Sequence, residues 1–84
     1  MSKKNKLLYK FKKEPPSKNL IWGELESLLS SLGFEQLQGN GSRVRFYHKD
    51  KEIVISLHKP HPENLLKTYV VKIVQDKLKE YNLE

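Results

Sequence analysis

Alternating apolar and polar residues in the middle of the chain constrain its fold more than any other feature. Apolar residues recur at every second position over residues 42–48 and again over 52–57, which is the period of a strand with one buried face. A Gly-Asn-Gly triplet at 39–41 precedes the first run, and a Lys-Asp-Lys triplet at 49–51 separates the two, as is typical of hairpin turns. Together with a weaker alternation over 34–38, the pattern predicts three antiparallel strands.

The alternation also divides the strand side chains between two faces. The apolar face consists of Val44, Phe46, Ile53, Ile55 and Leu57. The opposite face carries Arg43, Arg45, Tyr47, Val54, Ser56 and, in the same register, His58. The first set predicts the side of the sheet that faces a core, and the second set predicts the side that faces solvent or a partner.

Helical periodicity flanks the strands. Over residues 20–32 the apolar residues fall at spacings of one, three and four, and Gly33 follows as a stop signal. A second stripe of this kind begins near residues 66–68 and runs to about Tyr81. Two prolines mark the segment at 58–64 as a loop.

These elements follow one another as helix, three strands, helix. Two amphipathic helices and a half-apolar sheet pack most economically with both helices on the apolar face. We therefore predict an α+β fold of α-β-β-β-α order, with a three-stranded antiparallel sheet whose second face is open. The 84 residues suffice for one domain, and without cysteine it forms no disulfide and no thiolate metal site.

Basic charge is concentrated at the amino terminus. Residues 1–16 hold six lysines against one acidic residue and end in two prolines. We predict a flexible basic tail over residues 1–16 and a domain over 17–84. The segment also contains Leu7, Leu8, Tyr9 and Phe11, which leave open that part of the tail docks on the domain or on a partner. Its charge fits attraction to nucleic acid or another anionic surface, or a solvated arm that keeps the protein in solution.

The chain has no feature of a membrane or secreted protein. No apolar run approaches the roughly 20 residues of a membrane helix, and no apolar segment follows the first lysines as in a secretory signal. The absence of cysteine suits a reducing compartment. We expect a cytoplasmic protein with no membrane partner.

The open face of the predicted sheet fits a phosphate backbone. Arg43 and Arg45 offer forked donors to phosphate, and Tyr47 offers a ring on which a base can stack. A solvated sheet face carries charged residues in any case, so composition alone leaves both interpretations open.

Three histidines, His48, His58 and His61, are candidates for proton transfer. His58 differs from the others because its register places it beside the arginines. Metal-free RNA cleavage needs such a combination, a base for the 2′-hydroxyl proton and cations for the developing charge. An exposed or structural role is the alternative for each histidine. Prolines interleave His58 and His61, and no carboxylate beyond Glu63 is near them, so we expect neither a metal site nor a cofactor.

A family resemblance emerges from the order of these segments. The chain contains WGELESLLSSLGFEQLQGNGSRVRFYH, then EIVISLH, then ENLLKTYVVKIVQDKL, and over residues 20–81 it resembles the HicA toxins of bacterial toxin–antitoxin systems. The most specific parts are Leu-Gly-Phe at 32–34 and Gly-Ser at 41–42. The resemblance implies a double-stranded-RNA-binding-like fold. It also implies a ribosome-independent mRNA endonuclease that is held silent by a HicB-type antitoxin covering its active face.

One position departs from the family's pattern. The resemblance implies a catalytic histidine directly after the Gly-Ser pair, whereas this chain has Arg43 there. Arginine stays protonated and cannot serve as a general base. Three outcomes are open: His58 takes the role, the protein cleaves weakly by positioning and charge, or it binds RNA or the antitoxin without cutting.

We expect an RNA-binding toxin that is a monomer when alone. A non-catalytic RNA-binding module or a protein-interaction domain of the same fold is the alternative. The expected catalytic residue is His58. The expected RNA contacts are Arg43, Arg45, Tyr47, Lys59 and His61.

Overall fold

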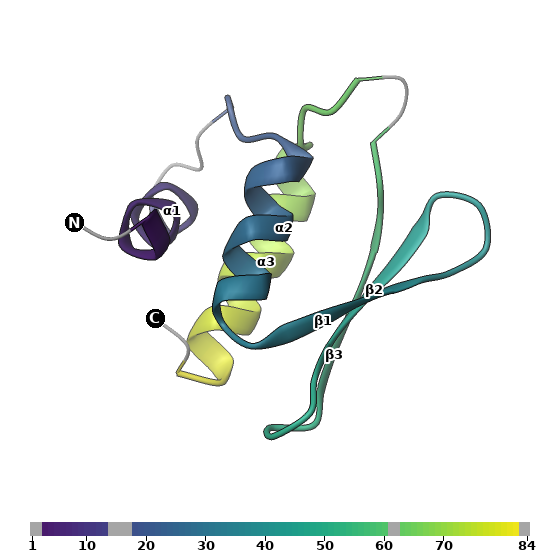
Figure 1. The fold of residues 1–84 in the computed structure, drawn as a ribbon. Coiled ribbons are helices and arrows are strands. Elements are labelled where there is room, and N and C mark those ends of the chain that lie inside the picture. Colours follow the sequence, from purple (N-terminus) through teal and green to yellow (C-terminus); the bar gives the residue numbers. More distant parts are fainter. Residues whose placement is uncertain (1–2, 14–17, 61–62, 83–84) are drawn as a thin grey trace.

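The computed structural model describes residues 3–13, 18–60 and 63–82. Its elements are α1 (Lys3–Lys12), α2 (Trp22–Ser31), β1 (Phe34–Gln38), β2 (Arg43–His48), β3 (Ile53–His58) and α3 (Thr68–Glu80). Figure 1 shows them in three layers: the sheet, then α2 beside α3, then α1. The predicted α+β fold is confirmed, and its element order is compatible with a double-stranded-RNA-binding-like fold. Among the described residues, no helix has the length and apolar character needed to cross a membrane.

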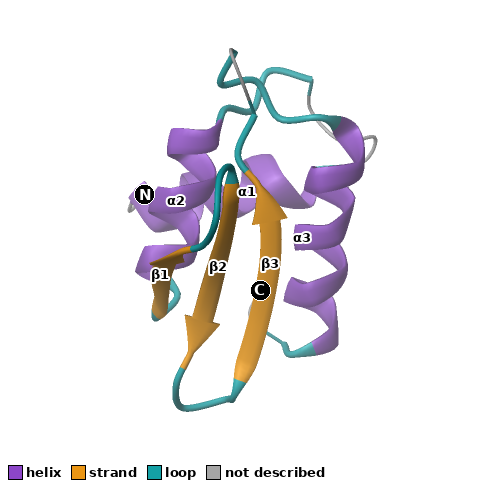
Figure 2. Cartoon of the chain, turned by 90° about the vertical axis from the view of Figure 1, so that its right-hand side faces the viewer, coloured by secondary structure: helices purple, strands orange, loops and turns teal. Residues whose placement is uncertain are grey.

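The sheet has the strand order β1-β2-β3, and both pairings are antiparallel. Burial alternates along β2 and β3 as the sequence predicts, with Val44, Phe46, Ile53, Ile55 and Leu57 all buried. Figure 2 shows the other face of the sheet toward the viewer, with all helices behind it. The prediction that the helices cover one face and leave the second open is therefore confirmed.

Helices α2 and α3 supply the opposite wall of the core. The buried residues of α2 are Trp22, Leu25, Leu28 and Leu29, and those of α3 include Val70, Val71, Val74 and Leu78. The Trp22 ring lies 5.8 Å from the Phe46 ring between centroids, so the start of α2 packs directly on the central strand.

The starts of α2 and α3 are tied together by extended backbone. Leu20 precedes α2 and accepts a hydrogen bond from the Leu66 N–H at 2.8 Å, and Ile21 forms an isolated bridge with Leu65. The periodic stripe over residues 20–32 therefore begins before the helix does. Apolar spacing alone could not reveal this, because it indicates that a residue such as Leu20 is buried and not whether its backbone is helical or extended. The bridge fixes the position of the segment that leads into α3.

The amino-terminal segment contains a helix that the sequence did not predict. In α1, Leu7 and Phe11 lie one helical turn apart and are both buried, Phe11 completely. They join the core cluster from the side of α2 and α3 that faces away from the sheet. The described part of the expected tail is thus packed, as the docking alternative allowed. The expected boundary between tail and domain falls at residues 14–17, outside the described residues.

Polar contacts tie α1 to α3 and to the start of α2. The buried Gln75 amide of α3 donates to the carbonyl oxygens of Phe11 at 2.6 Å and Lys13 at 3.2 Å. These carbonyls lie at the carboxyl end of α1, where backbone acceptors lack helical partners. The Lys10 ammonium donates at 2.6 Å to Glu24, whose carboxylate also accepts from the Ile21 N–H at the start of α2.

Candidate functional site

The pairing of β2 with β3 brings Arg43 and His58 side by side on the open face. The two residues are register partners, and both are exposed. The Lys59 N–H donates to the Ser42 carbonyl at 2.8 Å, which makes Arg43 and His58 a non-hydrogen-bonded pair. In such pairs the Cα atoms are only about 4.5 Å apart and the side chains are closest. The structure therefore joins the two residues that the sequence placed on neighbouring strands.

Ser42 contacts the imidazole of His58. Its hydroxyl oxygen lies 3.4 Å from Nδ1, a long and weak hydrogen bond whose donor depends on the tautomer. When Nδ1 carries the proton and donates to Ser42, Nε2 keeps a free lone pair on an exposed ring. In that tautomer His58 is able to accept a proton from a bound molecule.

The hairpin turn sets the position of Ser42 and Arg43. The Gly39 N–H donates to the Arg43 carbonyl oxygen at 2.9 Å, and the Arg43 N–H donates to Asn40 at 3.2 Å. A Cβ atom at Gly39 would stand 2.9 Å from the same carbonyl oxygen, so a larger residue would displace the strand. The glycines serve the turn, as predicted from the sequence, and the turn places Arg43 at the end of the open face.

The remaining open-face residues form rows across the three strands. Arg45 lies between Leu37 of β1 and Ser56 of β3, and Tyr47 lies between Glu35 and Val54. Arg45 is exposed and Tyr47 is half-buried. The predicted face of Arg43, Arg45, Tyr47, Val54, Ser56 and His58 is confirmed as one surface. It also contains Leu37, which sequence periodicity did not assign because β1 alternates weakly.

His48 has a structural position. Its Nδ1 accepts from the Lys51 N–H at 3.2 Å, and its Nε2 lies 3.1 Å from the Leu32 carbonyl oxygen. The first bond requires an unprotonated Nδ1, so Nε2 carries the proton and donates to Leu32. The ring also packs edge-on against Phe34. His48 thus ties the β2–β3 turn to the end of α2, on the covered side of the sheet.

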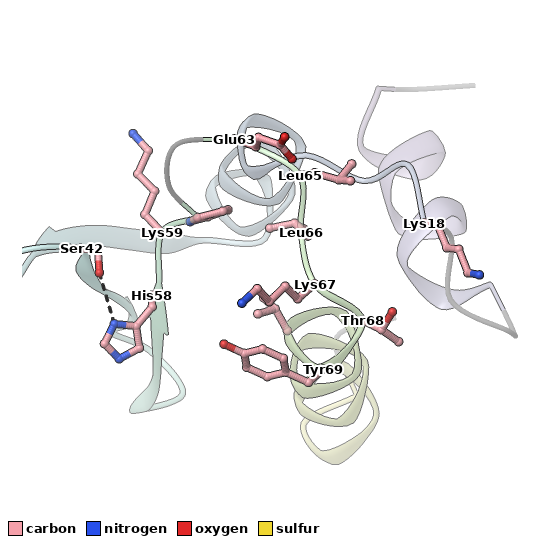
Figure 3. A pocket seen from close by; sticks show the side chains of 12 residues that line it. Lys18, Ser42, His58, Lys59, Glu63, Leu65, Leu66, Lys67, Thr68 and Tyr69 are labelled. Atoms are coloured by element: carbon pink, nitrogen blue, oxygen red, sulfur yellow. Dashed lines mark hydrogen bonds between the residues drawn. The ribbon is translucent and has the colours of Figure 1, made fainter.

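A groove of about 680 Å³ adjoins His58. We call it the β3–α3 groove: its strand side includes Ser42, His58 and Lys59, and its helix side includes Lys67, Thr68 and Tyr69. Figure 3 shows Lys67 and Tyr69 extending from the start of α3 toward the strand that carries His58. Lys59, an expected RNA contact, lies at this groove and not on the sheet face. The other expected contact in this loop, His61, lies outside the described residues.

Lys67 and Tyr69 were not among the site residues predicted from the sequence. Their distance from His58 depends on the path of the loop after β3. Hydrophobic periodicity in the sequence does not predict that path. The available signal was a basic and an aromatic residue at the predicted start of the last helix. Within the described ranges, no group of three histidine, aspartate or glutamate side chains is placed to hold a metal ion.

The basic amino-terminal segment is separate from this surface. Figure 1 places α1 on the far side of α2 and α3 from the sheet. Its described lysines therefore do not extend the open face, and one of them, Lys10, is paired with Glu24.

The fold and its open face define a small α+β domain with a cationic sheet surface that carries a histidine. Residues 22–83 match a family model described as "HicA toxin of bacterial toxin-antitoxin". The chain therefore belongs to the HicA toxin family and is a toxin of a toxin–antitoxin system. Comparison with curated proteins and with solved structures gave no match. Helix α1 precedes the matched residues.

Proposed function

We propose that this toxin binds mRNA across its open sheet face, cleaves it at the Arg43–His58 pair, and is neutralised when a HicB-type antitoxin covers that face. The pairing of Arg43 with His58 carries the proposal. The resemblance places the family's catalytic histidine at position 43, and His58 is the cross-strand neighbour of that position. An imidazole is therefore kept at nearly the same place on the surface, although it comes from the next strand.

In the proposed reaction His58 acts as the general base. Its Nε2 takes the proton of a 2′-hydroxyl group, and the 2′-oxygen forms a bond to the adjacent phosphorus. The bond from phosphorus to the 5′-oxygen breaks, and that oxygen takes a proton from water. Arg43 and Arg45 donate hydrogen bonds to the phosphate oxygens as charge develops on them. The expected products are a 2′,3′-cyclic phosphate and a 5′-hydroxyl end, which mass spectrometry identifies.

The two arginines are expected to supply most of the sheet's affinity for RNA. Replacing both, as Arg43→Ala plus Arg45→Ala, should weaken binding of a single-stranded RNA. It should also reduce the slope of log K against log salt by about 1.4, because each lost phosphate contact removes about 0.7. Fluorescence anisotropy over a salt series measures both quantities. The control is Lys72→Ala plus Lys79→Ala, which removes the same charge from the exposed side of α3; equal behaviour of the two variants would contradict the assignment.

The arginine at position 43 also supports a second candidate function. If the chemistry of the family depends on an imidazole at that position alone, this chain is an RNA-binding module that does not cut. Incubation of the purified protein with mRNA distinguishes the two functions, because only the first produces cyclic phosphate ends.

Exposed apolar residues on the open face support the proposed antitoxin contact. Leu37 and Val54 are 48% and 52% exposed, and both flank the row of cationic and aromatic side chains. Burial of such side chains against a partner gives affinity that a solvated RNA backbone does not supply. We therefore place the centre of the antitoxin interface between β1 and β3.

Replacing these two residues should weaken the antitoxin complex. With Leu37→Ser plus Val54→Ser, the dissociation constant for a co-expressed HicB-type protein should rise roughly fivefold or more, since completing the burial of a half-exposed Leu or Val side chain contributes on the order of 1 kcal/mol. Surface plasmon resonance measures the change. Ile73→Ser, at an exposed apolar position on α3, is the control. An unchanged constant for the double variant would place the interface elsewhere.

A further inference from the structure

An exposed aromatic ring stands in the β3–α3 groove. Tyr69 is 56% exposed, whereas the next two residues of α3, Val70 and Val71, are buried in the core. Figure 3 shows its hydroxyl end directed toward His58, with Lys67 beside it. The ring therefore presents its surface to the groove and contributes little to the packing of the helix. An accessible aromatic face of this kind is a platform on which an unpaired base stacks.

The charge of the groove favours a phosphate next to that ring. Among the described residues that line it are three lysines, Lys18, Lys59 and Lys67, against one acidic residue, Glu63. Figure 3 shows Lys18 at the far side and directed away and the Lys59 side chain extending away from His58 and Tyr69, so Lys67 is the cation whose ammonium turns toward His58. An ammonium group beside an exposed aromatic ring attracts the phosphate of a nucleic-acid strand.

The groove is continuous with the proposed cleavage site. His58 belongs to the open sheet face through its pairing with Arg43, and it also lines the groove together with Ser42. A strand bound at Arg43 and His58 that continues past the end of β3 therefore enters the groove. The volume of about 680 Å³ lies within the range of about 300–1,000 Å³ that is typical of small-molecule sites.

We propose that the β3–α3 groove binds one nucleotide of single-stranded RNA next to the scissile phosphate, with its base on Tyr69 and its phosphate at Lys67. The inference rests on the proposed function, since it assumes that RNA lies at Arg43 and His58. It adds a preference for unpaired RNA, because the bases of a duplex are stacked on one another and do not reach an aromatic side chain. The groove thus favours unpaired over duplex RNA on one side of the scissile phosphate.

The first test compares tyrosine variants. Tyr69→Ala should weaken binding of a short unpaired RNA roughly 5- to 150-fold, the range seen when a stacking ring is removed. Tyr69→Phe keeps the ring and should bind like the wild type. Tyr9→Ala removes another exposed tyrosine, on α1 at the far side of the helices, and should have no effect. Fluorescence anisotropy gives the constants, and thermal melting checks that each variant is folded.

The second test concerns charge and RNA structure. Lys67→Ala should reduce the salt slope by about 0.7, as expected for one lost contact to a single strand, and Lys79→Ala at the other end of α3 should not. The wild type should bind the unpaired RNA more tightly than a duplex of the same sequence. Photocrosslinking of RNA that contains 4-thiouridine to the wild-type chain, followed by peptide mapping, should mark Tyr69 without any substitution.

The outcomes separate this inference from the function on which it rests. If the wild type binds no RNA, both fail. If Arg43→Ala plus Arg45→Ala weakens binding but Tyr69→Ala and Lys67→Ala match their controls, the RNA site on the sheet stands and the groove proposal is overturned. Crosslinks confined to the sheet, or equal affinity for unpaired and duplex RNA, would overturn it as well.

Discussion

His58→Ala should lower the rate of RNA cleavage by roughly 100- to 10,000-fold, the contribution of a positioned general base. Growth inhibition by the expressed toxin should disappear with it. RNA affinity should change little, because the arginines that hold the phosphate stay in place. The side chain is exposed and its hydrogen bond to Ser42 is long, so the fold should keep its stability. Product analysis at a fixed protein concentration gives the rate, and anisotropy gives the affinity.

A matched control for this prediction lies on the same strand. Ser56→Ala changes an exposed residue two positions away on the same face and should leave the rate nearly unchanged. If the His58→Ala variant still cleaves RNA, His58 is not the general base. Positioning of the phosphate and the charge of the arginines would then account for the cleavage.

A second variant tests whether the imidazole is interchangeable between the two strands. Arg43→His in the His58→Ala background returns a histidine to the position where the resemblance places it. Because Arg43 and His58 are close cross-strand neighbours, the new ring would stand beside the lost one. Recovery of cleavage would show that the site needs one imidazole at this place. A different result would identify the wild type as a binding module: the wild type does not cut RNA, and the single substitution Arg43→His gives it cleavage activity.

The sheet surface could be predicted from sequence because strand geometry is local. The period of two assigns each residue of 43–48 and 53–58 to a face, and a short turn between the strands fixes their register. The neighbourhood of Arg43 and His58 follows from these two facts alone. The structure adds that Arg43 and His58 form a non-hydrogen-bonded pair and that His58 contacts Ser42. Both depend on the exact backbone geometry of the two strands.

The β3–α3 groove could not be predicted because it depends on loop conformation. The residues between β3 and α3 carry two prolines and no period, so no sequence rule states how far Tyr69 lies from His58. The bridge of Ile21 with Leu65 sets that path. It joins segments 44 residues apart in the chain, a separation at which local patterns carry no information.

Helix α1 was missed for a related reason. A helix of 10 residues is marginal in water on its own and forms because it packs. The surrounding segment 1–16, with six lysines, has the composition of a solvated tail. Among its described residues, Leu7 and Phe11, one turn apart, are buried in the core and Leu8 packs against it in part. The end of the helix is held by Gln75, which lies 64 residues from Phe11 in sequence. The helix is thus a consequence of the assembled domain.

Phe11→Ala should destabilise the folded protein by about 3–5 kcal/mol, the usual cost of truncating a buried phenylalanine. Phe11 is completely buried, and it belongs to the same core cluster as α2 and α3. The total free energy of unfolding of a native domain is only roughly 5–15 kcal/mol, so this loss is a large share of it. Urea unfolding followed by circular dichroism measures the difference. Tyr9→Ala, two residues away and 70% exposed, should change stability by less than about 0.5 kcal/mol.

The size of this loss of stability decides whether α1 is part of the core or a surface segment. A cost below about 1 kcal/mol would be that of a surface residue and would contradict docking of α1. A cost in the expected range makes α1 part of the core although it lies outside the matched residues 22–83. Removing residues 1–16 would then expose the apolar surface that Leu7 and Phe11 cover and would deprive the Gln75 amide of both its acceptors. The truncated chain should therefore unfold at lower urea concentration than Phe11→Ala, while its open sheet face, on the other side of the helices, should keep the same residues for RNA.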